Sequence, residues 1–160
     1  MPVLEPTQLR QALPRGQRLL GLDVGVKTIG LALSDALLMT ASPLHTIRRT
    51  KFGRDADALL GIVAERGVGG LVVGLPINMD GSEGPRCQSV RQFAANLLAR
   101  ADMPLAFWDE RLSTAAVERL LVEEADLSRR RRGQVVDKMA AAYILQGALE
   151  AMAERGVPPR

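Results

Sequence analysis

Three carboxylates stand where they could act together. Asp23 lies near the end of an apolar run, Glu110 directly follows another such run, and Asp137 lies in the first turn of a predicted alanine-rich helix. Ligands of α/β proteins bind beyond the carboxyl ends of strands, and two of these acids lie at predicted strand ends. If the last helix packs across the sheet with its first turn at this edge, the three side chains meet there.

Carboxylates gathered in this way need a counter-charge. Two of them about 4 Å apart repel by about 4 kcal/mol at an effective dielectric of about 20, so they either take up protons or bind a cation. Oxygen ligands without Cys or His favour Mg²⁺ or Mn²⁺. One or two such ions can hold a phosphodiester, activate a water and stabilise the leaving oxygen. The acids therefore predict a metal-dependent nuclease.

Each acid also has a simpler explanation. Asp23 could accept hydrogen bonds from the turn between Gly25 and Gly30, and Glu110 could pair with Arg111 on the surface. Asp137, taken alone, is better explained as an acid favoured by the positive end of a helix. Their joint placement is what favours a common site.

Composition narrows the class of protein. The 160 residues suit one domain, and a net charge of +3 is a mild indication of a polyanionic partner. Cys87 is the only cysteine, which excludes a disulfide within the chain and a thiolate metal cluster. His45 is the only histidine, so a Ser-His-Asp mechanism would have to use it. With no membrane-spanning stretch and no signal peptide, we expect a cytoplasmic enzyme or binding module.

Periodicity predicts the elements that position the acids. The expected strands are short apolar runs, over Leu19–Val24, Ile29–Ser34, Ala41–Ile47, Gly70–Leu75 and Pro104–Trp108. The expected helices have apolar residues at intervals of three and four, over Asp55–Arg66, Cys87–Arg100, Ser113 to about Glu124, and Val135–Met152. This order predicts an α/β protein whose mixed sheet carries helices on its faces. We expect an irregular lead-in over 1–18, one domain over 19–152 and a tail over 153–160.

The last helix is suited to a close approach to the sheet. Ala141, Ile144 and Ala148 follow Asp137 at spacings of three or four, so the four residues share one face. Small side chains on this face would let the backbone come near the sheet, so that a short aspartate can reach inward.

Four motifs in register resemble one family. LLGLDVGVKTIGLALSD, VVGLPINMDGSEG, DERLSTAAVERLL and VVDKMAAAYIL closely resemble the YqgF (RuvX) family, over about residues 19–150. That family is described as Holliday-junction-resolvase-like nucleases and as the nuclease that matures the 5′ end of pre-16S ribosomal RNA. The resemblance implies an RNase H-like fold, with a five-stranded mixed sheet whose first three strands are antiparallel and which is flanked by helices.

The resemblance also implies the site. It makes Asp23, Glu110 and Asp137 the catalytic and metal-binding acids. Related resolvases often carry a fourth acid three residues after the last one, where this chain has Ala140. With three acids, we do not expect two tightly bound ions in the absence of substrate.

Several polar residues are candidates for binding substrate. Asn78 and Ser82 could donate hydrogen bonds to phosphate oxygens, or the loop could be a polar turn that only caps the next helix. Lys27 and Arg111 each neighbour a candidate acid and could contact the phosphate backbone, although Arg111 could equally form a structural ion pair. Arg129, Arg130, Arg131 and Arg132 form a basic run, expected in an exposed loop that either clamps a nucleic-acid strand or is merely solvated.

The expected function is hydrolysis of structured RNA, with precursor ribosomal RNA as the substrate that the resemblance implies. A resolvase that cuts branched DNA, for which the protein would have to be a homodimer rather than a monomer, is the first alternative. A non-catalytic nucleic-acid-binding module is the second. An actin-like ATPase also has an Asp-x-Gly loop, but 160 residues leave no room for its second domain.

Overall fold

The computed structural model describes residues 3–113 and 129–156, with side chains described over 3–112 and 138–153. One six-stranded sheet runs through it in the order β1-β6-β5-β2-β3-β4. Strands β2, β3 and β4 form an antiparallel meander, and β2, β5, β6 and β1 pair in parallel. The strands are β1 (Val3–Leu4), β2 (Arg18–Val24), β3 (Thr28–Ser34), β4 (Ala41–Arg48), β5 (Val68–Leu75) and β6 (Leu105–Asp109).

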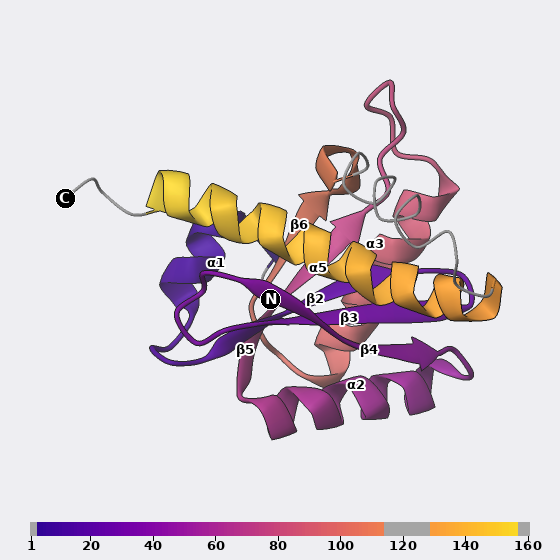
Figure 1. Ribbon diagram of the computed structural model, residues 1–160, viewed down its shortest axis with the longest axis horizontal. Helices are drawn as coiled ribbons and strands as arrows, with labels where there is room; N and C mark the ends of the chain where they lie inside the picture. Colours follow the sequence, from indigo (N-terminus) through magenta and orange to yellow (C-terminus); the bar gives the residue numbers. More distant parts are fainter. Residues whose placement is uncertain (1–2, 114–128, 157–160) are drawn as a thin grey trace.

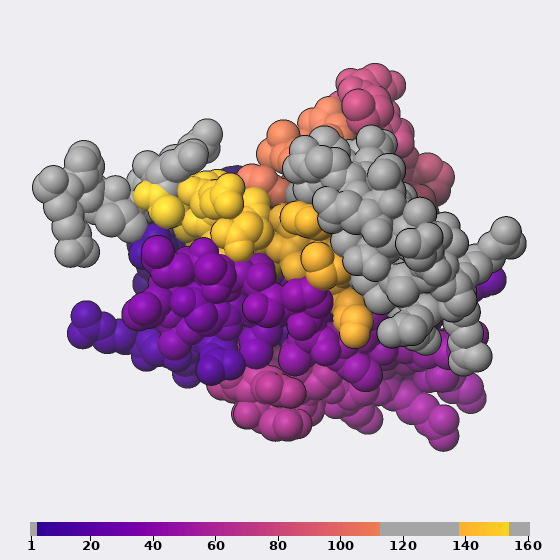
Figure 2. All heavy atoms as spheres, viewed as in Figure 1, coloured from indigo at the N-terminus to yellow at the C-terminus, as the bar shows by residue number. Residues whose placement is uncertain are grey.

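Helices cover both faces of the sheet (Figure 1). They are α1 (Pro6–Ala12), α2 (Phe52–Arg66), α3 (Pro85–Arg100) and α5 (Arg129–Gly156), with a 3₁₀ turn, η1, over Glu110–Ser113. Apolar side chains of α2 and α3 pack on one face, and those of α1 and α5 pack on the other. Figure 2 shows residues 138–153 of α5 as an orange-to-yellow band on the surface of this second face. The described helices include none that is long and apolar enough to span a membrane.

Strand β2 illustrates how the sequence sorts its side chains between the two faces. Leu20 and Leu22 pack in the core with α2 and α3, whereas Leu19 belongs to the core beneath α5. Because side chains of a strand alternate, Gly21 and Asp23 lie on the α5 face with Leu19. Asp23 therefore places a carboxylate on the α5 face of β2, whereas Leu20 and Leu22 keep the opposite face apolar.

Helix α5 rests almost directly on β2. A Cβ atom added to Gly21 would lie 2.8 Å from the Cβ of Leu145 and 3.0 Å from the carbonyl oxygen of Ala141. Ala141 and Ala148 are fully buried, and Ile144 is 2% exposed. The expectation that a face of small residues brings this helix close to the sheet is confirmed.

The three strands that were expected first, β2, β3 and β4, are antiparallel as expected. The sheet has six strands because the lead-in over 1–18 is not irregular. Val3 and Leu4 pair with β6, and α1 follows them. Pro6 occupies the first turn of α1, where its missing N–H costs nothing, and the backbone N–H of Glu5 donates to Oε1 of Gln8 at 2.9 Å. Leu9 is fully buried, and its burial stabilises the helix. The three prolines of this segment made it look irregular in the sequence, so that neither β1 nor α1 was predicted.

The last helix begins earlier than predicted. Arg129–Arg132, expected in a loop, form the first turn of α5, so Asp137 lies in a later turn than the first. Arginine is a good helix former, and a single interior glycine such as Gly133 costs a helix only about 1 kcal/mol. The helix predicted from Ser113 to about Glu124 lies outside the described residues, except for Ser113 itself, which ends η1.

Candidate active site

Glu110 lies over the sheet at the edge where β2, β5 and β6 end. It follows β6 directly, as the first residue of η1. A Cβ atom added to Gly74 of β5 would lie 2.8 Å from Oε1 of Glu110 and 3.0 Å from its Cγ. The same atom would lie 2.5 Å from Cδ1 of Ile144, so this is the α5 face. Glycine at position 74 therefore provides the space that the carboxylate occupies.

Asp23 is the neighbour of this carboxylate. Leu22 of β2 is opposite Val73 of β5, so Asp23 and Gly74 are the next residues along two paired strands. Asp23 faces α5, as Gly74 does, and its carboxyl group forms a hydrogen bond with that of Glu110. Two of the three predicted acids therefore meet on one face of the sheet, at the predicted edge.

The pair is electrostatically unusual. Burial, the charge of Asp23 and the hydrogen bond with Asp23 raise the pKa of Glu110 from 4.5 to about 8, against the opposing charge of Arg86. A hydrogen bond between two carboxyl groups requires a proton on one of them. Without a cation, the two groups therefore share a proton at neutral pH.

This donor set fits a divalent cation. Two carboxyl groups held together and partly buried favour a shared proton because two negative charges in contact repel, and an oxygen-binding cation can replace that proton. Among the residues with described side chains, no group of three Asp, Glu, His or Cys gathers to hold a metal. The third predicted acid, Asp137, lies outside that set.

The backbone of Asp137 belongs to α5, four residues before Ala141. Ala141 lies over Gly21, and α5 also contacts η1, which begins with Glu110. The C-terminal half of α5 packs with α1 at the opposite edge of the sheet, so its N-terminal half points toward the acid pair. The side chain of Asp137 is outside the described residues, and its membership of the site stays a prediction.

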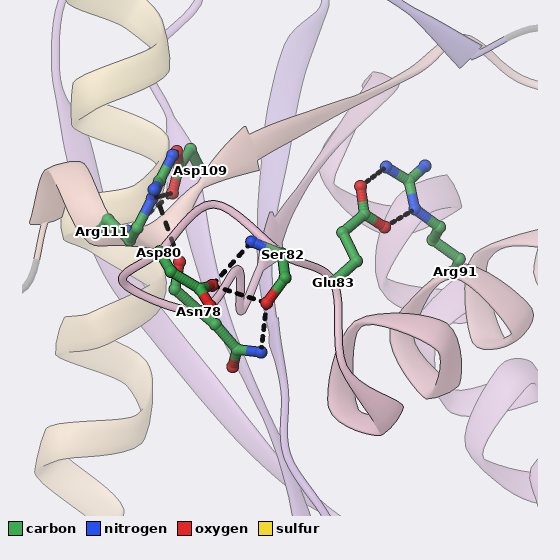
Figure 3. A network of polar contacts seen from close by, with 7 residues as sticks. All are labelled: Asn78, Asp80, Ser82, Glu83, Arg91, Asp109 and Arg111. Atoms are coloured by element: carbon green, nitrogen blue, oxygen red, sulfur yellow. Dashed lines mark hydrogen bonds and ion pairs between the residues drawn. The ribbon is translucent and has the colours of Figure 1, made fainter.

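An ion pair flanks Glu110 in the sequence (Figure 3). Arg111 donates from Nη2 to Oδ2 of Asp109 at 2.6 Å and from Nε to the same oxygen at 2.9 Å, and its backbone N–H donates to Oδ1 at 3.0 Å. These bonds lower the pKa of Asp109. The residues on both sides of Glu110 are thereby tied to each other, which fixes the backbone from which its side chain reaches Asp23.

The loop after β5 is tied to the same ion pair. Arg111 Nη1 donates to the carbonyl of Asn78 at 3.4 Å, and within the loop Asn78 Nδ2 donates to Ser82 Oγ at 3.0 Å. Ser82 in turn donates from its hydroxyl to Asp80 at 2.6 Å and from its backbone N–H at 2.9 Å. These bonds lower the pKa of Asp80. The loop is thus ordered by its own side chains (Figure 3).

Comparison with known proteins places this geometry in a family. The model of the RuvX family, described as Holliday junction resolvase, matches residues 17–151. The chain belongs to the RuvX family. It is 67% identical over 150 residues to a protein of Paramagnetospirillum magneticum, covering 94% of this chain and 96% of that one. It is 57% identical over 152 residues to a protein of Rhodospirillum rubrum, covering 95% and 94%. Both relatives carry the name "Putative pre-16S rRNA nuclease".

Solved structures support the fold of this RuvX chain. RuvC of T. thermophilus, in complex with a Holliday junction substrate, matches with a TM-score of 0.56 and 16% identity, over 89% of this chain and 99% of that one. The yeast mitochondrial Holliday junction resolvase matches with a TM-score of 0.52 and 9% identity, over 92% and 85%. The expected RNase H-like fold is confirmed. With the family, this identifies the chain as a nuclease, a hydrolase that acts on ester bonds.

The predicted substrate-binding residues of this RuvX nuclease fall into three groups. Lys27 is exposed in the turn between β2 and β3, four residues after Asp23. Arg111, Asn78 and Ser82 engage in the ion pair and loop bonds just described, so each would have to add a phosphate contact to those it makes. The side chains of Arg129–Arg132 lie outside the described residues. The binding roles of all these residues stay predictions.

Three residues of this edge were not predicted from the sequence. Gly74 lies in the GLP motif, and its glycine-specific contact with Glu110 has no signal in periodicity. Asp109 precedes Glu110, and an acid two residues before an arginine at a strand end is the signal of a local ion pair. Arg86 follows a proline that begins α3, and its guanidinium reaches the backbone after Asp23.

Proposed function

We propose that this chain is a divalent-metal-dependent nuclease that matures the 5′ end of pre-16S ribosomal RNA in the cytoplasm. The observation that carries the chemistry is the Asp23–Glu110 pair, two hydrogen-bonded carboxyl groups on one face of the sheet. The name that relatives at 67% and 57% identity carry supports the substrate. Asp137 is proposed as the third acid.

The site would bind Mg²⁺ or Mn²⁺, as one or two ions, through Asp23, Glu110 and Asp137. When bound, such an ion supplies an activated water and stabilises the leaving oxygen of the phosphodiester. With three acids, and Ala140 on α5 three residues after the last of them, the second ion is expected to bind firmly only with substrate.

The chain's own residues prepare this site before the ion arrives. Gly74 leaves room for the Glu110 carboxylate, and the Asp109–Arg111 pair fixes the backbone on either side of it. Asp23 extends from a strand paired on both sides, which holds it more firmly than a loop would. The proton shared by the two acids leaves when the cation binds, so cation binding strengthens as the pH rises.

The deciding experiment compares the wild type with Asp23→Asn on a 5′-labelled RNA that spans the 5′ boundary of 16S ribosomal RNA. Cleavage at the mature boundary in Mg²⁺ or Mn²⁺, lost in Asp23→Asn and retained in Asp57→Asn, is expected. Asp57 is a matched control because it is exposed on α2 and pairs with Arg100. Full activity in the folded Asp23→Asn protein would refute the proposal.

Branched DNA is the second candidate substrate, because the family model is described as Holliday junction resolvase. Paired cuts at a four-way junction require two active sites and hence a homodimer. Cleavage of a synthetic junction by a protein that sediments as a dimer, without cleavage of the precursor RNA, would favour this function. A monomer that trims the RNA would favour the first.

A further inference from the structure

Two arginines bind the backbone directly after Asp23. Arg86, in the first turn of α3, donates from Nη2 to the carbonyl of Val24 at 3.0 Å. Arg49, which follows β4, donates from Nη1 to the carbonyl of Gly25 at 2.6 Å. Two guanidinium groups from distant parts of the chain therefore converge on consecutive carbonyls, at the end of the strand that carries a candidate catalytic acid.

Arg49 is held in place by further contacts. Its guanidinium lies over the ring of Phe93 on α3, 5.4 Å from the centroid. Its backbone N–H donates to the carbonyl of Lys27 at 2.8 Å, which ties this segment to the β2–β3 turn. Phe93 is in turn held edge-to-face by Phe52, with centroids 5.5 Å apart. The guanidinium is therefore oriented before any ligand binds.

Arg91, Arg100 and Arg111 each pair with a carboxylate, whereas the hydrogen bonds of Arg49 and Arg86 described above go to backbone carbonyls. A guanidinium has five N–H donors, and each of these two hydrogen bonds engages one of them. Arg86 is exposed to solvent and Arg49 is partly exposed. Two oriented positive charges thus lie at the end of β2, and the charge of Arg86 acts on Glu110 of the acid pair.

The residues around them are also basic. Lys27, Arg48 and Lys51 are exposed. Asp55, the acid nearest in sequence to this segment, is 3% exposed and accepts hydrogen bonds from the backbone N–H and the hydroxyl of Thr50. Its charge is directed into the fold, which leaves the surface over residues 48–51 positive.

We propose that Arg49 and Arg86 bind a backbone phosphate of the nucleic acid next to the phosphate that is cleaved. The inference rests on the proposed nuclease function and adds a second phosphate site to it. Guanidinium groups match phosphate geometry through paired N–H donors. Because both side chains are already fixed by backbone carbonyls, little rotamer entropy is lost on binding. The bound phosphate sets how the strand lies relative to Asp23.

The experiment uses Arg49→Gln, Arg86→Gln and the double variant, each in the Asp23→Asn background so that the RNA stays intact. Binding of the fluorescent boundary RNA is measured by anisotropy over a series of KCl concentrations. The control is Arg66→Gln, an exposed arginine in the last turn of α2 and outside this cluster. The double variant should bind about ten-fold more weakly, and its slope of log K against log salt should fall by about 0.7, as for one single-strand phosphate contact.

A scan with single methylphosphonate linkages, which lack the phosphate charge, locates the contact. We expect one methylphosphonate linkage beside the cleavage site to weaken binding to the Asp23→Asn protein that retains Arg49 and Arg86. The same linkage should not change binding to the double variant. Equal affinity, equal salt slope and an equal response to every linkage would overturn the inference, since the arginines would then only brace the end of β2. If the wild type neither binds nor cleaves any RNA or DNA probe, the proposed function itself fails.

Discussion

Two neighbouring groups of acids at the same edge of the sheet are treated in opposite ways. Asp109 and Asp80 are satisfied by Arg111 and Ser82, and both have lowered pKa values. Glu110, adjacent to Asp109 in sequence, faces another acid and has a raised pKa. Asp109 and Asp80 fix the local structure, whereas the Asp23–Glu110 pair is the proposed cation site. The arginines divide in the same way between carboxylate pairs and backbone carbonyls.

The first way to break this comparison is to crowd the Asp23–Glu110 pair. Gly74→Ala should displace the Glu110 carboxylate, because the new Cβ would lie 2.8 Å from Oε1. A displacement of about 1 Å is expected to lower kcat by about 100-fold. Gly61→Ala on α2, where a Cβ meets nothing within 4 Å, is the matched control and should retain activity. Equal rates for the two variants would show that Glu110 is not positioned by this contact.

Weakening the Asp109–Arg111 ion pair should lower activity less than Gly74→Ala does. Asp109→Asn removes the charge that holds Arg111, and with it the restraint on the backbone around Glu110. Residues that orient a metal ligand typically contribute 10–100-fold to activity or metal affinity, so about 10-fold is expected here. Metal affinity by calorimetry and kcat at saturating metal separate a positioning effect from a general loss of stability. An unchanged metal affinity in a folded variant would count against the positioning role.

The raised pKa of Glu110 predicts a dependence of stability on pH in metal-free protein. Because the folded pKa, about 8, exceeds the usual value of 4.5, its stabilising contribution is complete below about 4.5 and is lost as the pH rises through 8. Relative to Glu110→Gln, the wild type should therefore lose stability between pH 5 and pH 9. At about 2–4 °C per kcal/mol, a difference in Tm of at least about 3 °C is expected. Mg²⁺ should restore the wild type at pH 9 but not the variant.

The smallest effect is expected at an exposed pair. Glu83 and Arg91 form an ion pair at 2.7 Å with side chains 33% and 41% exposed, and such pairs contribute about 0–1 kcal/mol to stability. Arg91→Gln should leave cleavage unchanged and lower Tm by no more than about 3 °C. A loss of activity as large as that of Asp109→Asn would remove the distinction between structural and functional charges drawn above.

The elements that the sequence predicted well are those whose signal is local. The apolar run from Leu19 to Val24 and the helical spacing before Gly67 needed no partner to be recognised, and β2 and α2 agree with them within three residues. The first helix was missed because its stability comes from burial of Leu9 against other elements. The start of α5 was missed because four arginines suggest a solvated loop, although arginine also favours helix.

The site divides similarly. The sequence predicted that Asp23 and Glu110 lie near each other, because an acid at a strand end has an expected place in the fold even when its contacts are unknown. The contact of Glu110 with Gly74, and the convergence of Arg49 and Arg86, depend on register and on packing between distant segments. No property of the individual residues encodes these contacts. They became visible only when β5 and α3 were placed beside β2.

The close packing of α5 on Gly21 has a mechanical consequence. With Ala141 fixed over β2, the helix backbone back to Arg129 continues for twelve more residues, a reach of about 18 Å at about 1.5 Å per residue. That length matches about five base steps of a nucleic-acid strand at about 3.4 Å each. A deletion of one residue between Gly133 and Asp137 would shorten this reach slightly but would rotate the helix start by about 100°. A change of length in this segment would therefore alter the direction in which the start of α5 faces more than its distance from Ala141.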